Sequence, residues 1–420
     1  MEKNYFESII GYGAIKLELS RILDQLIYPE KYTALGVKEP HGLLLHGVPG
    51  VGKSTMAQCL VEACGRTSFV CRKNKSNGDF VNEIVRVFDK AEAAAPSVVF
   101  LDDIDKFANE DESHCDSEEF VTVQACIDKV KDKRVFVVAT ANNRRKLPGS
   151  LMRPGRFDHI LELHCPKGQD AEDIVAYYLS QKAYVADMDV KRIARLLEGK
   201  SCAQLETVVN QAGAYAAFDG RTQVEMRDMI KAILRIVFEA PESFTQDLST
   251  LPLTACHEAG HALVAELLQP DSVNLVTVLN HDSYAAGIIS LHREEGYFHS
   301  KKMMENRVMC LLAGKAAIEV CYGTVDLGAN NDLKRAFDIV HRFVDHYCSY
   351  GFAQFLFDQV PSNGVLDRRD TQVAAEMEHY YAQTKQLIID NRVKLDKLTA
   401  RLIEEKTLLG DQVQEIIKCA

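Results

Sequence analysis

The chain has 420 residues, of which 47% are hydrophobic, and a formal net charge of -11. This length allows two or three separately cored domains, and acidic residues spread along the chain exclude a nucleic-acid-binding surface as the main function. The twelve cysteines form no CxxC pair and recur in apolar stretches, which is typical of reduced packing residues in a cytoplasmic protein. The sequence has no signal peptide and no run of about 18 apolar residues, so we expect a chain that does not span a membrane.

Residues 1–168 alternate short apolar runs with amphipathic stretches. The runs are continuously hydrophobic, which is typical of strands in a parallel sheet that helices cover on both faces. We therefore predict an α/β nucleotide-binding domain with a doubly wound parallel sheet. The expected strands are Gly42–His46, Ser68–Cys71, Ser97–Asp102, Arg134–Ala139 and His159–His164, and a helix is expected over Asp79–Ala95.

Helical periodicity replaces the strand signals after residue 168. The patterns at Val190–Glu198 and Gln204–Phe218 predict a small helical lid over residues 169–239. The polar, proline-bearing stretch 240–252 is predicted to be a linker. Residues 253–420 are predicted to form a mainly helical domain with one hairpin around Val273–Leu291.

A phosphate-binding loop follows the first predicted strand. Residues 47–54 fit GxxxxGK[ST] between a strand and a helix. Backbone N–H groups of such a loop surround the phosphates of ATP, Lys53 can reach the terminal phosphates, and the Ser54 hydroxyl can ligate Mg²⁺. The alternative is an ordinary glycine-rich turn before a helix. The expected nucleotide contacts are Gly47, Val48, Pro49, Gly50, Val51, Gly52, Lys53, Ser54 and Thr55.

The apolar strand that ends at Asp102 carries a second acid, Asp103. Asp102 is expected to hold the Mg²⁺ shell and Asp103 to act as the base that polarises the attacking water. The alternative role for such a pair is a helix cap. Asn142, just beyond a later strand, is placed to hydrogen-bond the same water or the γ-phosphate.

Residues 153–158 contain the turn Arg-Pro-Gly-Arg. Arg153 and Arg156 suit arginine fingers that stabilise transition-state charge on the nucleotide of a neighbouring subunit. Taken alone, this turn is more typical of a protein surface, and only its spacing from Asn142 and from the acidic strand favours a finger. The finger interpretation implies a ring-shaped assembly.

Two histidines four residues apart, in His-Glu-Ala-Gly-His, predict a metal site. On a helix, His257 and His261 project from one face and can bind one Zn²⁺, and Glu258 can serve as general base for a water that attacks a peptide carbonyl. The alternative is a charged helix face, but this helix is otherwise apolar, and burying these groups without a metal is costly. Spacing leaves the third protein ligand open. The candidates are Glu319, Asp326, Asp332, His292, His299, His341 and His346.

These motifs, in this order, resemble FtsH-type AAA proteases across almost the whole chain. The resemblance implies that Ile10, Gly11 and Tyr12 lie near the adenine. It also implies that residues 199–205 begin a nucleotide-contacting lid helix, in which Cys202 and Gln204 depart from the usual glycine and acid.

The resemblance extends to the helical domain. Residues 312–317 and 328–333 look like family signatures, and the aspartate of the second is the family's third zinc ligand, which selects Asp332. The segment 287–290 resembles the edge strand that pairs with an extended substrate. The implied cofactors are Zn²⁺, ATP and Mg²⁺.

Three features depart from the family pattern. The ATPase domain begins near the first residue of the given sequence, so we expect either a relative without the usual N-terminal membrane anchor or one from which the anchor was trimmed. The segment 73–81, where a substrate-gripping aromatic is expected, is short and polar, so Phe80 is either a pore residue or a helix-packing residue. Asp103 replaces the usual glutamate, which predicts slow ATP hydrolysis.

We therefore expect an ATP-dependent zinc endopeptidase that acts on unfolded or loosely folded proteins as a homo-hexamer. We expect it in the cytoplasm, and at a membrane only through a trimmed anchor or a partner. The alternative is a nucleotide-gated ring ATPase that acts as an assembly or regulatory factor with weak or poorly coupled peptidase activity.

Overall fold

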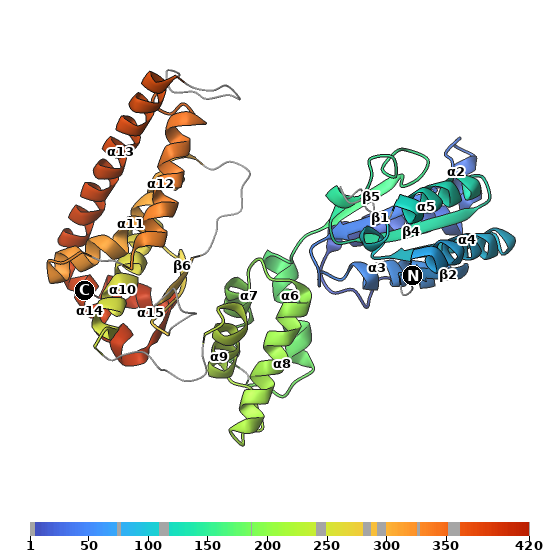
Figure 1. Cartoon of the computed structure of the whole chain (residues 1–420). Helices are drawn as coiled ribbons and strands as arrows, with labels where there is room; N and C mark the ends of the chain where they lie inside the picture. Colours follow the sequence, from blue (N-terminus) through green and yellow to red (C-terminus); the bar gives the residue numbers. More distant parts are fainter. Residues whose placement is uncertain are drawn as a thin grey trace. The chain divides into compact units, whose positions relative to one another are not determined.

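The computed structural model describes residues 5–73, 77–108, 117–185, 187–240, 249–279, 287–291, 300–325, 328–351 and 362–419. The chain divides into two compact units, Met1–Met229 and Ile230–Ala420; Figure 1 colours the chain from blue at the N-terminus to red at the C-terminus. The division falls inside α9 (Met226–Val237), within the region predicted to be the lid.

A five-stranded parallel sheet with the order β2-β3-β4-β1-β5 forms the centre of the first unit. All five predicted strands are confirmed, with small displacements of their ends. Their bounds are β1 (Gly42–Gly47), β2 (Thr67–Arg72), β3 (Ser97–Asp102), β4 (Val135–Ala141) and β5 (His159–Leu163). Because β1 and β3 lie on either side of β4, the segments that follow these three strands meet at the carboxyl edge of the sheet.

Helices cover both faces of this sheet. Apolar residues of α4 and α5 share a core with Leu44 and other strand residues, whereas α3 packs against β1, β3 and β4. Leu43 and Leu45 alternate with Leu44 and are also fully buried, so both faces are covered. The doubly wound architecture is thus confirmed. The helices are α1 (Gly13–Ile27), α2 (Pro29–Thr33), α3 (Lys53–Ala63), α4 (Asn77–Ala93) and α5 (Ser117–Val130).

Phe80 belongs to the core of α4. Its side chain is fully buried, and its ring packs edge-on against Phe107 with centroids 5.1 Å apart. A residue buried in this way cannot grip a passing chain. Of the two interpretations of Phe80, the helix-packing one therefore fits the structure.

Three helices follow the sheet within the first unit: α6 (Gly168–Ser180), α7 (Val190–Leu196) and α8 (Cys202–Phe218). The helix α8 begins two residues before its predicted start because Ser201 and Gln204 form a reciprocal capping box. Gln204, which departs from the acid usual in the resembled family, is thus used to cap the helix.

The second unit is mainly helical. Its helices are α10 (Leu251–Leu268), α11 (Lys301–Tyr322), α12 (Asn330–Asp345), α13 (Asn363–Asp390), α14 (Arg392–Glu405) and α15 (Gly410–Lys418). The helix α10 begins inside the predicted linker, since Pro252 needs no N–H bond in the first turn. Among the described helices, none is long and apolar enough to cross a membrane.

A small antiparallel sheet with the order β7-β6-β8 completes the second unit. The predicted hairpin pairing is confirmed by β6 (Val273–Thr277) and β7 (Ile288–Leu291). The strand β8 (Thr407–Leu409) was not predicted, because three residues are too few to show a strand pattern.

The helices α10 and α11 cross at very short range. A Cβ placed on Gly260 would lie 2.6 Å from Cβ of Ala317 and 2.8 Å from the carbonyl oxygen of Ala313. Only glycine fits this crossing without displacement, so the pair of helices forms a closely packed platform for the histidines of α10.

Candidate nucleotide and zinc sites

The predicted phosphate loop lies between β1 and α3. Gly50 and Gly52 have φ values of +80° and +91°, a region that favours glycine. Because α3 begins at Lys53, the unpaired N–H groups of its first turn face the loop. Lys53 Nζ donates to the carbonyls of Gly47 at 2.9 Å and Val48 at 3.0 Å. Burial lowers the pKa of Lys53, and the nearby acids oppose this effect.

Ser54 and Asp102 meet although they belong to different motifs. Asp102 Oδ1 accepts the Ser54 hydroxyl at 2.9 Å and the Thr140 hydroxyl at 2.7 Å. Thr140 Oγ1 in turn accepts the backbone N–H of Asp103 at 2.9 Å. A buried carboxylate beside a loop hydroxyl is a donor set that suits Mg²⁺. Thr140 lies inside an apolar strand and was missed, because no motif points to it.

The Asp103 carboxylate has a partner on each oxygen. Oδ1 accepts from Asn142 Nδ2 at 3.3 Å, and Oδ2 accepts from Lys106 Nζ at 2.6 Å. Asp103 precedes a short 3-10 helix but makes no side-chain cap, so the cap interpretation finds no support. Arg72, at the end of β2, places Nη2 3.9 Å from Asp103 Oδ2. Neither cation was singled out from the sequence.

The two arginines of the predicted finger turn differ in their surroundings. Arg156 forms a bidentate pair with Asp128 of α5 at 2.8 and 2.7 Å and also donates to the carbonyl of Ser150 at 2.6 Å. These hydrogen bonds hold the pKa of Asp128 below its usual range. Arg153 is exposed. Arg156 is thus engaged within its own chain, whereas these hydrogen bonds do not hold the side chain of Arg153.

Tyr12 connects the start of the chain to the segment that leads into the lid. Its N–H donates to Asp170 Oδ1 at 2.9 Å, and its hydroxyl donates to the carbonyl of His164 at 2.9 Å. Burial is the main cause that raises the pKa of Tyr12. Gly11, at φ +68°, lies against Asp170, and Ile10 is half-buried.

The lid helix α8 contacts the phosphate loop at its first turn. The N–H of Ala203 donates to the carbonyl of Gly50 at 3.1 Å, and a Cβ on Gly50 would lie 2.8 Å from Ser201 Oγ. The sequence segment expected to contact nucleotide thus lies against the loop expected to bind phosphate. The glycine cradle, the buried lysine and the hydroxyl–carboxylate pair fit Mg²⁺-ATP.

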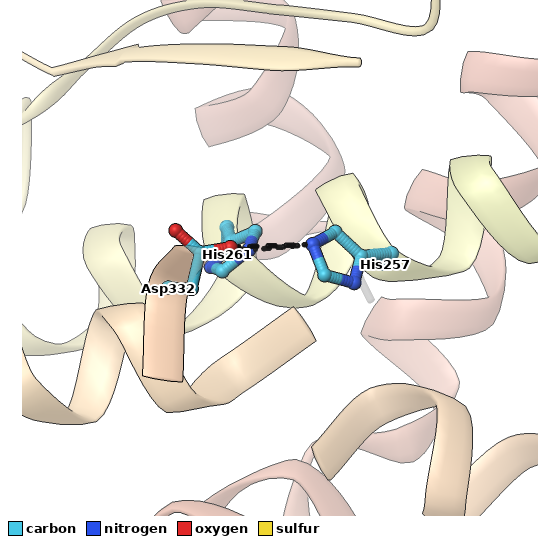
Figure 2. A group of neighbouring side chains, drawn as sticks. All are labelled: His257, His261 and Asp332. Carbon is cyan, nitrogen blue, oxygen red and sulfur yellow. Dashed lines mark hydrogen bonds and ion pairs between the residues drawn. The ribbon is translucent and has the colours of Figure 1, made fainter. Parts of the chain in front are cut away.

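His257, His261 and Asp332 converge on one point, as Figure 2 shows. The Nε2 atoms of the two histidines are 3.0 Å apart, and Asp332 Oδ2 lies 3.6 Å from His257 Nε2 and 3.3 Å from His261 Nε2. Zinc bonds of about 2.0–2.1 Å at tetrahedral angles separate neighbouring ligand atoms by about 3.3 Å. These three atoms therefore fit one face of a zinc tetrahedron.

Neighbouring groups orient these ligands. His261 Nδ1 lies 2.6 Å from the carbonyl of Cys310, so Nδ1–H donates there and Nε2 is left for the metal. Gly314 of α11 lies against the other imidazole, and a Cβ there would come within 2.4 Å of His257 Cε1. Burial would raise the pKa of Asp332, but the histidines outweigh this effect and lower it.

Other candidate ligands of the described chain have different partners. Glu319 accepts from Tyr381 and, at 2.7 Å, from Lys385, and these hydrogen bonds lower its pKa to about 2. His341 and His346 both pair with Asp345. Among the described residues, no other group of three converges on a possible metal position. The remaining candidates, Asp326, His292 and His299, lie outside the described residues.

Glu258 is buried beside these ligands and lies against the small sheet. A Cβ on Gly287 would fall 2.7 Å from Glu258 Oε1. Gly287 immediately precedes β7, which among the described strands pairs only with β6 and is therefore an edge strand. The carboxylate is thus held between the zinc ligands and the end of an edge strand.

Comparison with known proteins agrees with this pair of sites. Residues 43–165 match the ATPase family associated with various cellular activities (AAA), and residues 247–416 match peptidase family M41. The ATP-dependent zinc metalloprotease FtsH 1 of Thermomicrobium roseum is 30% identical, over 98% of this chain and 68% of the relative. This chain belongs to the FtsH family of ATP-dependent zinc metalloproteases.

Further FtsH relatives show the same extent of similarity. FtsH of Thermus thermophilus is 29% identical over 98% of this chain and 70% of its own length. FtsH of Caldicellulosiruptor bescii is 29% identical over 99% of this chain and 72% of its own length. As a member of this family the chain is a protease and an ATPase, with Zn²⁺, ATP and Mg²⁺ as cofactors.

Two glycines near the zinc site had no assigned role at the sequence level. Gly314 and Gly287 lie in segments noted for their family resemblance, but their function is steric: each leaves room for a side chain of the site. The carbonyl of Cys310 carries no sequence signal at all, because every residue has a carbonyl.

Proposed function

We propose that this chain is an ATP-dependent zinc endopeptidase that cleaves unfolded or loosely folded proteins as a homo-hexamer. The observation that carries the proposal is the position of Glu258, which lies beside two imidazoles and a carboxylate with zinc spacing and against Gly287, the residue that precedes an edge strand. The proposed metal ligands and the proposed general base for peptide hydrolysis thus lie together.

The edge strand supplies a way to bind peptides of many sequences. An extended polypeptide can add to β7 through backbone hydrogen bonds, because the opposite side of β7 has no partner strand in the described sheet. Gly287 brings the carboxylate of Glu258 against this strand. A carbonyl of the bound peptide would then lie near the point where the three ligands converge.

The residues of the site divide the chemistry among themselves. His257, His261 and Asp332 would hold the zinc ion, which would supply Lewis acidity and a nucleophile near neutral pH. Glu258 accepts the proton of the attacking water and returns it to the leaving amine. The Cys310 carbonyl keeps His261 in the tautomer that presents Nε2.

In the ATPase unit, Lys53 and Ser54 are proposed to hold the phosphates and Mg²⁺ with Asp102. Asp103 is the proposed base, and Asn142, which already contacts Asp103, orients the same water. The ion pair with Lys106 occupies one oxygen of Asp103, which supports slow hydrolysis.

The ring proposal rests on the arginine turn. Arg153 is exposed and is proposed to act on the nucleotide of an adjacent subunit, while Arg156 holds the turn against α5 through Asp128. The cysteines of the described residues are free of disulfides, which supports a cytoplasmic location.

Degradation of two reporters tests the proposed function. A permanently unfolded protein and a stably folded one carrying the same tag are incubated with zinc-loaded chain and ATP. Wild type is compared with Glu258→Gln, which removes the base but keeps the shape, and with Lys53→Ala. We expect wild type to degrade the unfolded reporter and both variants to lose this activity, with zinc content of Glu258→Gln unchanged.

The controls separate the alternatives. Light scattering with and without ATP measures the oligomeric state, and a stable monomer under all conditions would contradict the ring. Degradation retained in Glu258→Gln would defeat the protease mechanism. Cleavage of short peptides that is insensitive to Lys53→Ala, without protein degradation, would favour the nucleotide-gated assembly factor.

A further inference from the structure

Two cysteines meet beside the zinc ligand His257. Cys256 directly precedes His257 on α10, and its side chain is only 1% exposed. Cys321 lies in the last turn of α11 and is half-buried. The side chains of Cys256 and Cys321 interact with each other. Neither thiol has a role in the nucleotide or zinc chemistry described above.

The crossing of α10 and α11 explains why these thiols are so close. Gly260 faces Ala317 at the crossing, with a Cβ on Gly260 only 2.6 Å from Cβ of Ala317. Cys256 lies one turn before Gly260, and Cys321 lies one turn after Ala317, so the two cysteines face each other in the same way. Disulfides join Cα atoms about 4.4–6.8 Å apart, a separation that such a close crossing permits.

The surroundings give the two sulfurs different reactivity. Arg392 of α14 donates to the carbonyl of Val320 at 3.0 Å and so lies next to Cys321. Interaction with Cys256 and the nearby Arg392 lower the pKa of Cys321, whereas burial and Asp396 oppose this effect. Because Cys321 is half-buried and Cys256 is only 1% exposed, an oxidant reaches Cys321 first, and Cys256 is placed to resolve the adduct.

We propose that Cys256 and Cys321 form a reversible disulfide, a modification site that connects thiol redox state to the zinc helix. With glutathione disulfide as the oxidant, the Cys321 thiolate attacks one of its sulfurs and one glutathione thiolate leaves. Cys256 then loses its proton and attacks the Cys321 sulfur, which releases the second glutathione. Two protein thiols are oxidised, and one glutathione disulfide is reduced to two glutathione thiols.

The new bond would shift the zinc ligand. Disulfide formation brings the sulfurs to about 2.05 Å, which draws α10 at Cys256 toward α11. His257 is the next residue, and its imidazole is already packed against Gly314, so it cannot adjust independently. Because a displacement of about 1 Å in a catalytic group can cost about 100-fold in rate, peptide cleavage is expected to fall at least tenfold.

Thiol mapping of the full, zinc-loaded chain tests this proposal. The protein is equilibrated in glutathione buffers of increasing oxidised fraction, free thiols are alkylated, and proteolytic fragments are identified by mass spectrometry. We expect a fragment that links Cys256 to Cys321 and disappears with dithiothreitol. The exposed Cys419 is expected to carry only a glutathione adduct, because the structure gives it no contact with another thiol among the described residues.

Variants provide the controls. Cys321→Ser should yield no linked fragment, should keep the cleavage rate of the reduced enzyme, and should lose the effect of oxidation on that rate. Cys348→Ser, which changes a half-buried cysteine elsewhere in the same unit, should behave as wild type. Should Cys321→Ser fold poorly, Cys256→Ala makes the same prediction for the linked fragment.

Two results would overturn the proposal. One is recovery of Cys321 only as a glutathione adduct, without a linked fragment in any buffer. The other is an unchanged cleavage rate in protein that is mostly cross-linked, which would remove the connection to the zinc helix. Fragment mapping does not require catalysis, so a chain that fails to cleave peptides would contradict the proposed function and still report on the disulfide.

Discussion

Gly314→Ala tests whether steric support from α11 positions a zinc ligand. In the structure a Cβ at this position would lie 2.4 Å from His257 Cε1, whereas ordinary van der Waals contact begins at 3.4 Å. The imidazole or the helix must therefore move by about 1 Å, and zinc ligands tolerate only about 0.2 Å. We expect zinc affinity to fall by about tenfold to 100-fold, the range typical of lost support around a metal ligand.

The effect on folding should be much smaller than the effect on zinc. Overpacking costs about 1–3 kcal/mol, and alanine recovers up to about 1 kcal/mol through its higher helix propensity. The variant should therefore remain folded, with a circular dichroism spectrum like that of wild type. A loss of zinc affinity in a folded variant can therefore be attributed to the displaced His257 imidazole and not to unfolding.

Zinc affinity is measured by competition with a chromophoric chelator, and peptide cleavage is followed in parallel across zinc concentrations. Gly213→Ala is the matched control, because Gly213 is also inside a helix but a Cβ there meets nothing within 4 Å. The control should bind zinc and cleave peptide like wild type. Wild-type zinc affinity together with wild-type cleavage in Gly314→Ala would refute the steric argument.

Three further predictions concern other parts of the chain. Thr140→Val removes the hydroxyl that connects Asp102 to the Asp103 N–H, and leaving that N–H unpaired costs about 1–3 kcal/mol. The affinity for Mg²⁺-ATP, measured with a fluorescent analogue, should therefore fall about tenfold. Unchanged affinity would count against the arrangement. Lys106→Ala frees one oxygen of Asp103, and an exposed ion pair of this kind is worth about 0.2–1 kcal/mol. The kcat for ATP hydrolysis should therefore rise by up to about fivefold with KM unchanged. A fall in kcat would show that Lys106 supports the reaction. Glu319→Gln should lower the melting temperature by about 2 °C at pH 7, because folding depresses the Glu319 pKa from 4.5 to about 2 and the ionised carboxylate stabilises the fold. The difference in melting temperature from wild type should narrow as the pH falls from 5 toward 2. A difference that does not change with pH would contradict the assignment.

The ATPase sheet was largely predictable because its strands are buried on both faces. Continuous apolar runs such as Ser97–Asp102 are hard to confuse with amphipathic helices, and that strand has the predicted bounds. The strand β8 escaped prediction because its stability comes from pairing with β6 and not from its own three residues. The start of α8 moved because a local capping box, Ser201 with Gln204, extended the helix.

Residue roles were less predictable where a partner comes from a distant segment. Arg156 belongs to a turn that suggests an arginine finger, yet Asp128 engages it within the chain. Phe80 falls where a pore residue is expected, yet Phe107 packs against it in the core. In both cases the partner comes from a segment outside the motif, so the motif alone could not predict the contact.

The sequence by itself determined the sites whose groups lie within one turn or one loop. His257 and His261 share a helix face because the helical period places them there, and the phosphate loop is set by glycines within a few residues of Lys53. Only the tertiary structure brought Asp332, Gly314 and the Cys310 carbonyl to these histidines. Those positions depend on how α10, α11 and α12 pack, and packing distance is a property of the assembled helices and not of any local spacing.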